Sequence, residues 1–106
     1  DTAAAIAGSQ LVVAAGAAGI PLLSVADRQG CEGLKVAIDL NAVPPLGVEG
    51  TAVTDKAVEY DGVICYGAIG VGGTKMKIHR AALESLFESN DKVLDAPEIY
   101  RIGCQL

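Results

Sequence analysis

The chain has 106 residues, of which 51% are hydrophobic and only 4% aromatic, and its formal net charge at pH 7 is −5. This length allows one domain, and an apolar content built from Ala, Val, Ile and Leu is typical of buried parallel strands and their packing helices. Apart from the group Lys75, Lys77 and Arg80, the Lys and Arg residues are scattered. No basic stripe therefore suits a nucleic-acid backbone, and we expect no nucleic-acid partner.

Two further classes are disfavoured by the order of the residues. No apolar run reaches the roughly 18 residues that a membrane span needs, and no signal segment stands at the start, so we expect a cytoplasmic protein without a membrane partner. Cys31, Cys65 and Cys104 are widely spaced and odd in number. This pattern fits reduced thiols, mostly small buried hydrophobes, and predicts no metal site.

The first forty residues predict a β-α-β unit. Residues 1–7 resemble the end of a helix, and the chain begins without Met, so we expect further residues upstream of Asp1. Residues 10–15 predict an apolar strand that is followed by Gly16. Residues 21–30 predict a helix with Pro21 in its first turn and Gly30 at its end, and residues 35–39 predict the next, parallel strand.

Polar residues follow the second predicted strand. Asp39 and Asn41 lead into residues 41–47, where Pro44 and Pro45 stop any helix. Ligands of open parallel sheets bind beyond the carboxyl ends of the strands, so Asp39 and Asn41 are candidate ligand contacts. The alternative is that both residues shape the turn by bonding nearby backbone groups. For Asn41 we favour the ligand, because the two prolines would fix its direction.

Glycines dominate the segment after a predicted hairpin at residues 60–62. Positions 67, 70, 72 and 73 are glycines, and Thr74 is placed to cap the helix that follows. Glycines let a backbone approach a ligand, and a helix N-terminus attracts anions, so Gly70 and Gly72 are candidate ligand contacts. The spacing matches neither the dinucleotide fingerprint nor the phosphate loop, and a tight strand-to-helix turn is the alternative.

The predicted helix that follows has one apolar stripe, with Met76, Leu83 and Phe87 at its centre. Lys75 lies beside it in the first turn, where a cation opposes the helix dipole. Its side chain either contacts an anionic substrate or cofactor group or extends to water. His79 also points to the apolar edge, and we favour a hydrogen-bonded core histidine over a catalytic one.

Several of these segments, in this order, resemble the C-terminal part of the bacterial NAD(P)-dependent methylene-tetrahydromethanopterin dehydrogenases. The resemblance spans almost the whole chain and is densest between residues 39 and 100. The segments that carry it are residues 39–47, 54–56, 66–79, 86–89 and 95–100.

The resemblance implies an α/β fold, the C-terminal portion of a Rossmann-like doubly wound parallel sheet. Residues 1–106 would be the C-terminal part of the nucleotide-binding domain. The upstream half of that domain, with its glycine-rich phosphate fingerprint, and an N-terminal substrate domain would be absent from this chain. The family also implies a homo-oligomer.

The implied reaction is transfer of a hydride from methylene-tetrahydromethanopterin, or from methylene-tetrahydrofolate, to NADP or NAD. No proton moves in that step, so the absence of an obvious acid–base pair counts little against a dehydrogenase, and no catalytic residue is assigned. Gly16, Ala17 and Ala18 would pass under the ribose or nicotinamide of the cofactor, with Asp39, Asn41, Gly70 and Gly72 as further cofactor contacts.

Two other interpretations stay open. A shikimate dehydrogenase-like oxidoreductase would keep the nucleotide fold and also has a strand-end Asp before a Pro-containing loop, although the match over residues 67–79 disfavours it. Alternatively, the 106 residues are a non-catalytic fragment or an assembly module.

Overall fold

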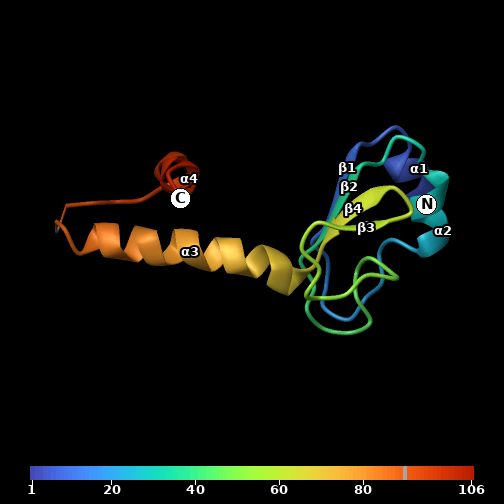
Figure 1. The fold of residues 1–106 in the computed structure, drawn as a ribbon, viewed down its shortest axis with the longest axis horizontal. Coiled ribbons are helices and arrows are strands. Elements are labelled where there is room, and N and C mark those ends of the chain that lie inside the picture. The colour runs from blue at the N-terminus through green and yellow to red at the C-terminus, as the bar shows by residue number, and fades with distance from the viewer. Residues whose placement is uncertain (90) are drawn as a thin grey trace. The chain divides into compact units, whose positions relative to one another are not determined.

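The computed structural model describes residues 1–89 and 91–106, which form two compact units, Asp1–Val71 and Gly72–Leu106. The first unit contains the sheet and the second contains most of the last two helices (Figure 1). In chain order the elements are α1 (Thr2–Ile6), β1 (Leu11–Ala14), α2 (Val25–Gly30), β2 (Val36–Asp39), β3 (Val58–Tyr60), β4 (Val63–Tyr66), α3 (Ala68–Leu86) and α4 (Ala96–Cys104).

The first unit is built on a four-stranded, mostly parallel sheet with the strand order β1-β2-β4-β3. β1, β2 and β4 are parallel, and only β3 is antiparallel to its neighbour. The strands predicted at residues 10–15 and 35–39 are therefore confirmed as a parallel pair. Their apolar and β-branched side chains suit burial within a sheet.

A tight hairpin joins β3 to β4, as the sequence predicts. Asp61 and Gly62 occupy its two central positions with φ values of 52° and 81°. Positive φ at both positions is the mark of a type I′ turn, whose twist matches that of the flanking strands.

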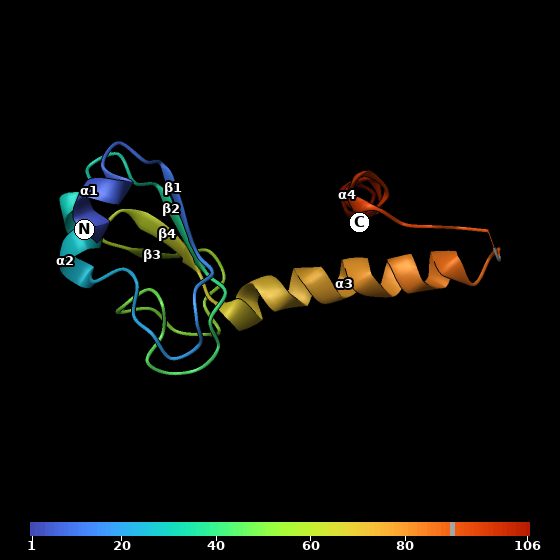
Figure 2. The ribbon, with the colours of Figure 1, turned by 180° about the vertical axis from the view of Figure 1, so that it is seen from behind.

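The core of the first unit lies between the sheet and the two short helices α1 and α2. Both helices lie on the same side of the sheet in two opposite views (Figures 1 and 2). Ile6 of α1 packs with Ala14 of β1 in one buried cluster, while Ala37 and Cys65 belong to a second cluster on the neighbouring strands. Val12 touches both clusters, which makes the core continuous.

The helix predicted over residues 21–30 begins four residues later than expected. Ser24 is its N-cap, and the Ser24 side chain accepts a hydrogen bond from the N–H of Asp27 at 3.0 Å. Leu22 and Leu23 stay extended because their N–H groups both donate to the carbonyl of Gly47, at 2.9 and 2.8 Å. A contact with a distant loop thus overrides the local helix signal of Pro21, which was misleading.

The predicted glycine loop is wrong. α3 begins at Ala68, so Gly70, Gly72, Gly73 and Thr74 lie inside the helix, and Thr74 is not its cap. Gly67 and Gly70 pack closely against the loop at residues 52–55, where a Cβ would overlap the backbone. The helix forms in spite of the low helix propensity of glycine.

The second unit contains the rest of α3 together with α4. Asp95 caps α4 by accepting from the N–H of Glu98 at 3.5 Å, and Pro97 occupies the first turn. α4 lies against α3 where Gly103 faces Ile78, since a Cβ at position 103 would stand 3.1 Å from Ile78 Cδ1. Among the described residues, no helix is long and apolar enough to cross a membrane.

Candidate functional site at the carboxyl edge of the sheet

Asp39 is the most deeply buried polar residue at the carboxyl end of β2, with 1% of its surface exposed. Oδ1 accepts from the N–H of Asn41 at 3.0 Å, and Oδ2 accepts from the N–H of Val48 at 3.0 Å. Charge-assisted bonds of this kind are about twice as strong as neutral ones. Both carboxylate oxygens therefore hold the two ends of the loop that follows the strand.

Asn41 is also buried and also bonds to the same loop. Its Oδ1 accepts from the N–H of Val43 at 2.9 Å, and its Nδ2 donates to the carbonyl of Pro45 at 3.2 Å. These bonds are the turn-shaping contacts that the sequence offered as the alternative role. Contact of Asp39 or Asn41 with a cofactor stays a prediction. In the structure, the hydrogen bonds of both side chains hold the loop that follows β2 in one conformation.

Gly16, Ala17 and Ala18 follow β1 at the same edge and are exposed. Gly19, with a φ of 75°, turns this loop so that a Cβ there would lie 3.7 Å from the carbonyl oxygen of Pro44. The loop after β1 and the loop after β2 thus lie side by side. Ala17 and Ala18 are small and exposed, whereas one face of Gly16 is covered by Leu22, since a Cβ at Gly16 would stand 2.7 Å from Leu22 Cδ1.

Gly47 fastens these two loops to the sheet. A Cβ at this position would stand 2.8 Å from Asp39 Oδ1 and 3.2 Å from Ala14 Cβ, so only glycine fits. The Gly47 carbonyl accepts hydrogen bonds from the N–H groups of Leu22 and Leu23. The N–H of Glu49 donates to the carbonyl of Leu23 at 2.9 Å. The structure therefore brings the predicted contacts Gly16, Ala17, Ala18, Asp39 and Asn41 together on one scaffold.

The start of α3 is packed against the loop at residues 52–55. The N–H groups of Ile69 and Gly70 donate to the carbonyl of Val53, at 2.8 and 3.3 Å, and the N–H of Gly67 donates to that of Asp55 at 2.9 Å. Cβ atoms at Gly67 or Gly70 would overlap carbonyl oxygens of this loop. Gly70 is therefore required for close helix–loop packing, and its contact with a cofactor stays a prediction.

Every described helix has an oxygen atom of the chain itself bonded to an N–H group in or beside its first turn. Because the free N–H groups of a helix are what attract a phosphate, these contacts weaken each terminus as an anion site. The oxygens belong to the side chains of Asp1, Ser24 and Asp95 and to the backbone carbonyl of Val53.

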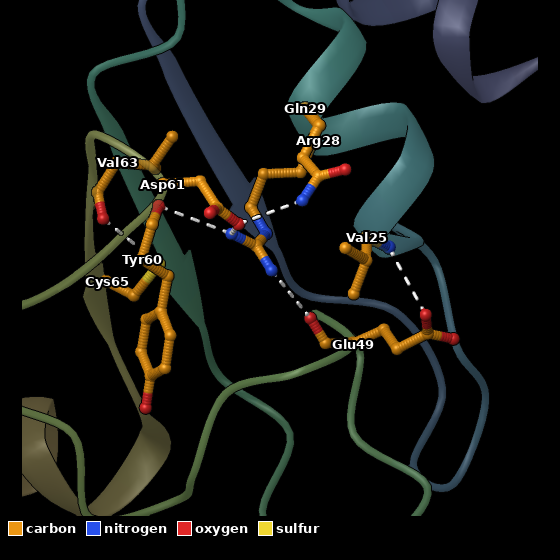
Figure 3. A network of polar contacts seen from close by, with 8 residues as sticks. All are labelled: Val25, Arg28, Gln29, Glu49, Tyr60, Asp61, Val63 and Cys65. Carbon is orange, nitrogen blue, oxygen red and sulfur yellow. Dashed lines mark hydrogen bonds and ion pairs between the residues drawn. The ribbon is translucent and has the colours of Figure 1, made fainter.

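Arg28 is a buried residue that sequence reasoning missed. It lies on α2 with 3% of its surface exposed, and its guanidinium donates to the carbonyls of Tyr60 and Glu49, both at 3.3 Å (Figure 3). Nη1 also lies 3.5 Å from Asp61 Oδ2. Arg28 therefore joins α2 to the hairpin and to the loop after β2. The sequence carried no signal for this, because an arginine in a short helix normally faces water.

Asp55 is the second missed residue, and its carboxylate holds the loop that receives α3. Oδ2 accepts from the N–H of Ala52 and from the hydroxyl of Tyr60, both at 2.8 Å. The hydrogen bond from Tyr60 to this carboxylate, helped by burial, raises the pKa of Tyr60 above its usual 10.0. Burial also raises the pKa of the Cys65 thiol, which suits an inert core cysteine.

The remaining predicted residues belong to the second unit. Gly72 and Lys75 both lie within α3, and Lys75 is exposed. His79 is exposed as well, so the expected core histidine is wrong, because the face of α3 that carries it is not buried. Cys104 is likewise exposed, unlike Cys65.

Two proteins of Methylorubrum extorquens are similar to this chain along nearly all of its length. A bifunctional protein, MdtA, is 44% identical over 104 residues, which are 98% of this chain and 36% of that protein. An NAD(P)-dependent methylenetetrahydromethanopterin dehydrogenase is 29% identical over 106 residues, covering 97% of this chain and 36% of the relative. The chain thus spans about a third of the length of these relatives, and no family model matches it.

Proposed function

We propose that the chain is the C-terminal part of an NAD(P)-dependent methylene-tetrahydromethanopterin dehydrogenase, a cytoplasmic oxidoreductase of one-carbon metabolism. The observation that carries the proposal is the carboxyl edge of the sheet, where a small-residue loop lies beside a loop fixed by two buried polar residues. Two similar proteins, one of them named for this activity, match nearly the whole chain. The structure supports an α/β fold with a mostly parallel sheet. In a Rossmann-like domain, strands from the upstream part would extend this sheet.

The edge suits one end of a nicotinamide dinucleotide better than the other. The exposed loop at residues 16–18 offers bare backbone to a ribose or a nicotinamide ring. The pyrophosphate lacks a comparable place in the described residues, since each helix N-terminus is bonded to an oxygen of the chain. We therefore infer that residues upstream of Asp1 bind the phosphates.

When bound, the nicotinamide accepts the hydride, and the chain contributes alignment. Gly16, Ala17 and Ala18 allow the ring to approach the strand end. Asp39 and Asn41 keep the neighbouring loop in one conformation, so that the edge is preorganised before the substrate arrives. No residue of the edge has to move a proton, because hydride transfer from a methylene bridge leaves a cation spread over two pterin nitrogens.

The first strand of the sheet gives independent support for a missing half. β1 is an edge strand without Pro or charge, and Leu11 and Val13 expose 55% and 49% of their surfaces. Unprotected apolar edges promote association, and natural sheets cover them. A parallel strand of the upstream half would pair with this edge, and helices of that half would cover the face on which Leu11 and Val13 lie, because side chains alternate between the two faces of a sheet.

The experiment that tests the proposal is a rate measurement on a polypeptide that also carries the upstream part. Methylene-tetrahydromethanopterin, methylene-tetrahydrofolate and a shikimate-type hydroxy acid are offered separately with NAD or NADP, and absorbance of reduced cofactor is followed. Turnover on a pterin supports the proposal. Turnover on the hydroxy acid alone would select the shikimate dehydrogenase-like alternative, and no turnover would select the non-catalytic one.

The role of Lys75 can be tested by replacing it with alanine, with Lys77→Ala on the same helix as the control. If Lys75 contacts an anionic group of cofactor or substrate, Lys75→Ala weakens binding by a charge-assisted bond, about 1.5–3 kcal/mol. Lys77, two residues away and also exposed, is the control. Equal small effects of Lys75→Ala and Lys77→Ala on the Michaelis constants would show that the Lys75 side chain only extends to water.

A further inference from the structure

Asp39 carries a buried charge at the carboxyl edge of the sheet. Only 1% of its surface is exposed, and its two oxygens accept from the N–H groups of Asn41 and Val48, each at 3.0 Å. Both donors are neutral, and neither ion pair among the described residues includes Asp39. Because a buried charge without a partner of opposite sign is costly, this carboxylate favours a cation nearby.

The two loops at this edge contain no other charge. Residues 15–24, after β1, and residues 40–48, after β2, include no Asp, Glu, Lys or Arg, although 20% of the chain is charged. Large apolar side chains of these loops are 39–52% exposed instead, those of Ile20, Leu22, Leu40 and Val43. Apolar surroundings screen a charge less than water does. The field of Asp39 therefore extends to a ligand bound at the edge.

The strand register places Asp39 close to the loop after β1. Asp39 is paired with Ala14, the last residue of β1. With strands about 4.8 Å apart and about 3.3 Å of rise per residue, Gly16 lies about 8 Å from Asp39 between Cα atoms. Asp55, the other buried carboxylate, lies further from β1, because its backbone carbonyl accepts from the N–H of Gly67 after β4. Asp39 is therefore the buried carboxylate closer to residues 16–18.

Hydride transfer changes the charge of a ring at this position. The C–H bond of the methylene bridge breaks, and the hydrogen leaves with its electron pair to bond to the nicotinamide. One positive charge thus moves from the oxidised nicotinamide to the pterin, and the reduced nicotinamide is neutral. A carboxylate close to the nicotinamide consequently distinguishes the oxidised cofactor from the reduced one.

We propose that the Asp39 carboxylate is the counter-charge of the oxidised nicotinamide and makes this edge bind the oxidised cofactor more tightly than the reduced one. The inference rests on the proposed function and gives Asp39 a role beyond holding its loop. Asp39 acts through its field, from the core side of the loops, without touching the ring. At about 10 Å and an effective dielectric constant of about 20, two unit charges interact strongly enough to change a dissociation constant about tenfold.

Cofactor titrations of the polypeptide that also carries the upstream part test this role. Dissociation constants are measured for oxidised and reduced NAD or NADP, before and after Asp39→Asn, which removes the charge and keeps the shape. The preference for the oxidised form falls about tenfold. A loosened loop alone weakens both forms alike and leaves their ratio unchanged. Asp61→Asn removes a charge at the hairpin, at the opposite end of β4, and leaves the ratio unchanged as the control.

A neutral ring provides a second measurement that needs no substitution at Asp39. A dinucleotide in which a benzamide replaces the nicotinamide has a flat ring without the positive charge, and the unsubstituted polypeptide binds it about tenfold more weakly than the oxidised cofactor. Equal binding of the two overturns the inference, as does an unchanged ratio in folded Asp39→Asn or an equal change in Asp61→Asn. If no dinucleotide binds in either oxidation state, the proposed function fails together with the inference.

Discussion

Replacing Gly70 with alanine tests the packing of the first turn of α3. Helix propensity alone predicts that this change stabilises the protein by about 1 kcal/mol. The structure predicts the reverse, because the new Cβ would overlap the carbonyl oxygen of Asp55 and stand 2.8 Å from its carbon. The obstacle is backbone, so no side-chain rotation relieves it.

The size of the effect follows from the contacts that must shift. The N–H groups of Ile69 and Gly70 both bond to the carbonyl of Val53. Weakening two such bonds costs about 2 kcal/mol, overpacking adds about 1–3 kcal/mol, and the propensity gain of about 1 kcal/mol offsets part of this. We therefore expect Gly70→Ala to lower the free energy of unfolding by about 2–4 kcal/mol.

Urea unfolding followed by far-ultraviolet circular dichroism measures this difference. Gly73→Ala on the same helix is the matched control, because the space around its Cβ is open, and it should stabilise by about 0.5–1 kcal/mol. If Gly70→Ala stabilises the chain as Gly73→Ala does, the packing of α3 on the loop at residues 52–55 is refuted.

Three further predictions concern the buried polar residues. Asp39→Asn should lower the free energy of unfolding by about 1.5–3 kcal/mol in urea, since an amide accepts through one oxygen where the carboxylate uses two. An unchanged urea midpoint would contradict the two hydrogen bonds from Asn41 and Val48 to the carboxylate. Arg28→Met should cost about 2–4 kcal/mol because two carbonyls lose their donor, and a neutral result would mean that water replaces the guanidinium. Because the pKa of Tyr60 is raised when folded, its contribution to stability is complete below pH 10.0 and is lost as pH rises through the folded pKa; phenolate absorbance should show one tyrosine titrating late, and Tyr60→Phe should remove it.

Much of the first unit was predictable from short segments. The β-branched runs at residues 10–15 and 35–39 identify parallel strands, and Asp61-Gly62 identifies the hairpin, because these signals depend on neighbouring residues alone. Asp39 and Asn41 were also placed correctly at the carboxyl edge. Their partners were not predictable, since Val48 and Pro45 reach them only after the loop closes.

The start of α3 shows why local signals fail elsewhere. Four glycines in seven residues normally predict a loop, and Thr74 is a good cap. The helix nevertheless begins at Ala68, because the carbonyls of the loop at residues 52–55 receive its first N–H groups. The same tertiary contacts explain the glycines at positions 67 and 70 without a ligand, a conclusion that no reading of residues 67–74 alone could reach.

The most direct test of the proposed cofactor edge is a nuclear magnetic resonance titration of the polypeptide that includes the upstream part. NAD and NADP are added separately while the backbone amide resonances are followed. We expect shifts at Gly16, Ala17, Ala18 and Asn41, with the hairpin at Asp61 unchanged, and only weak effects in the isolated 106-residue chain. Tight cofactor binding by the isolated chain, or saturation of the longer polypeptide without shifts at the edge, would contradict it.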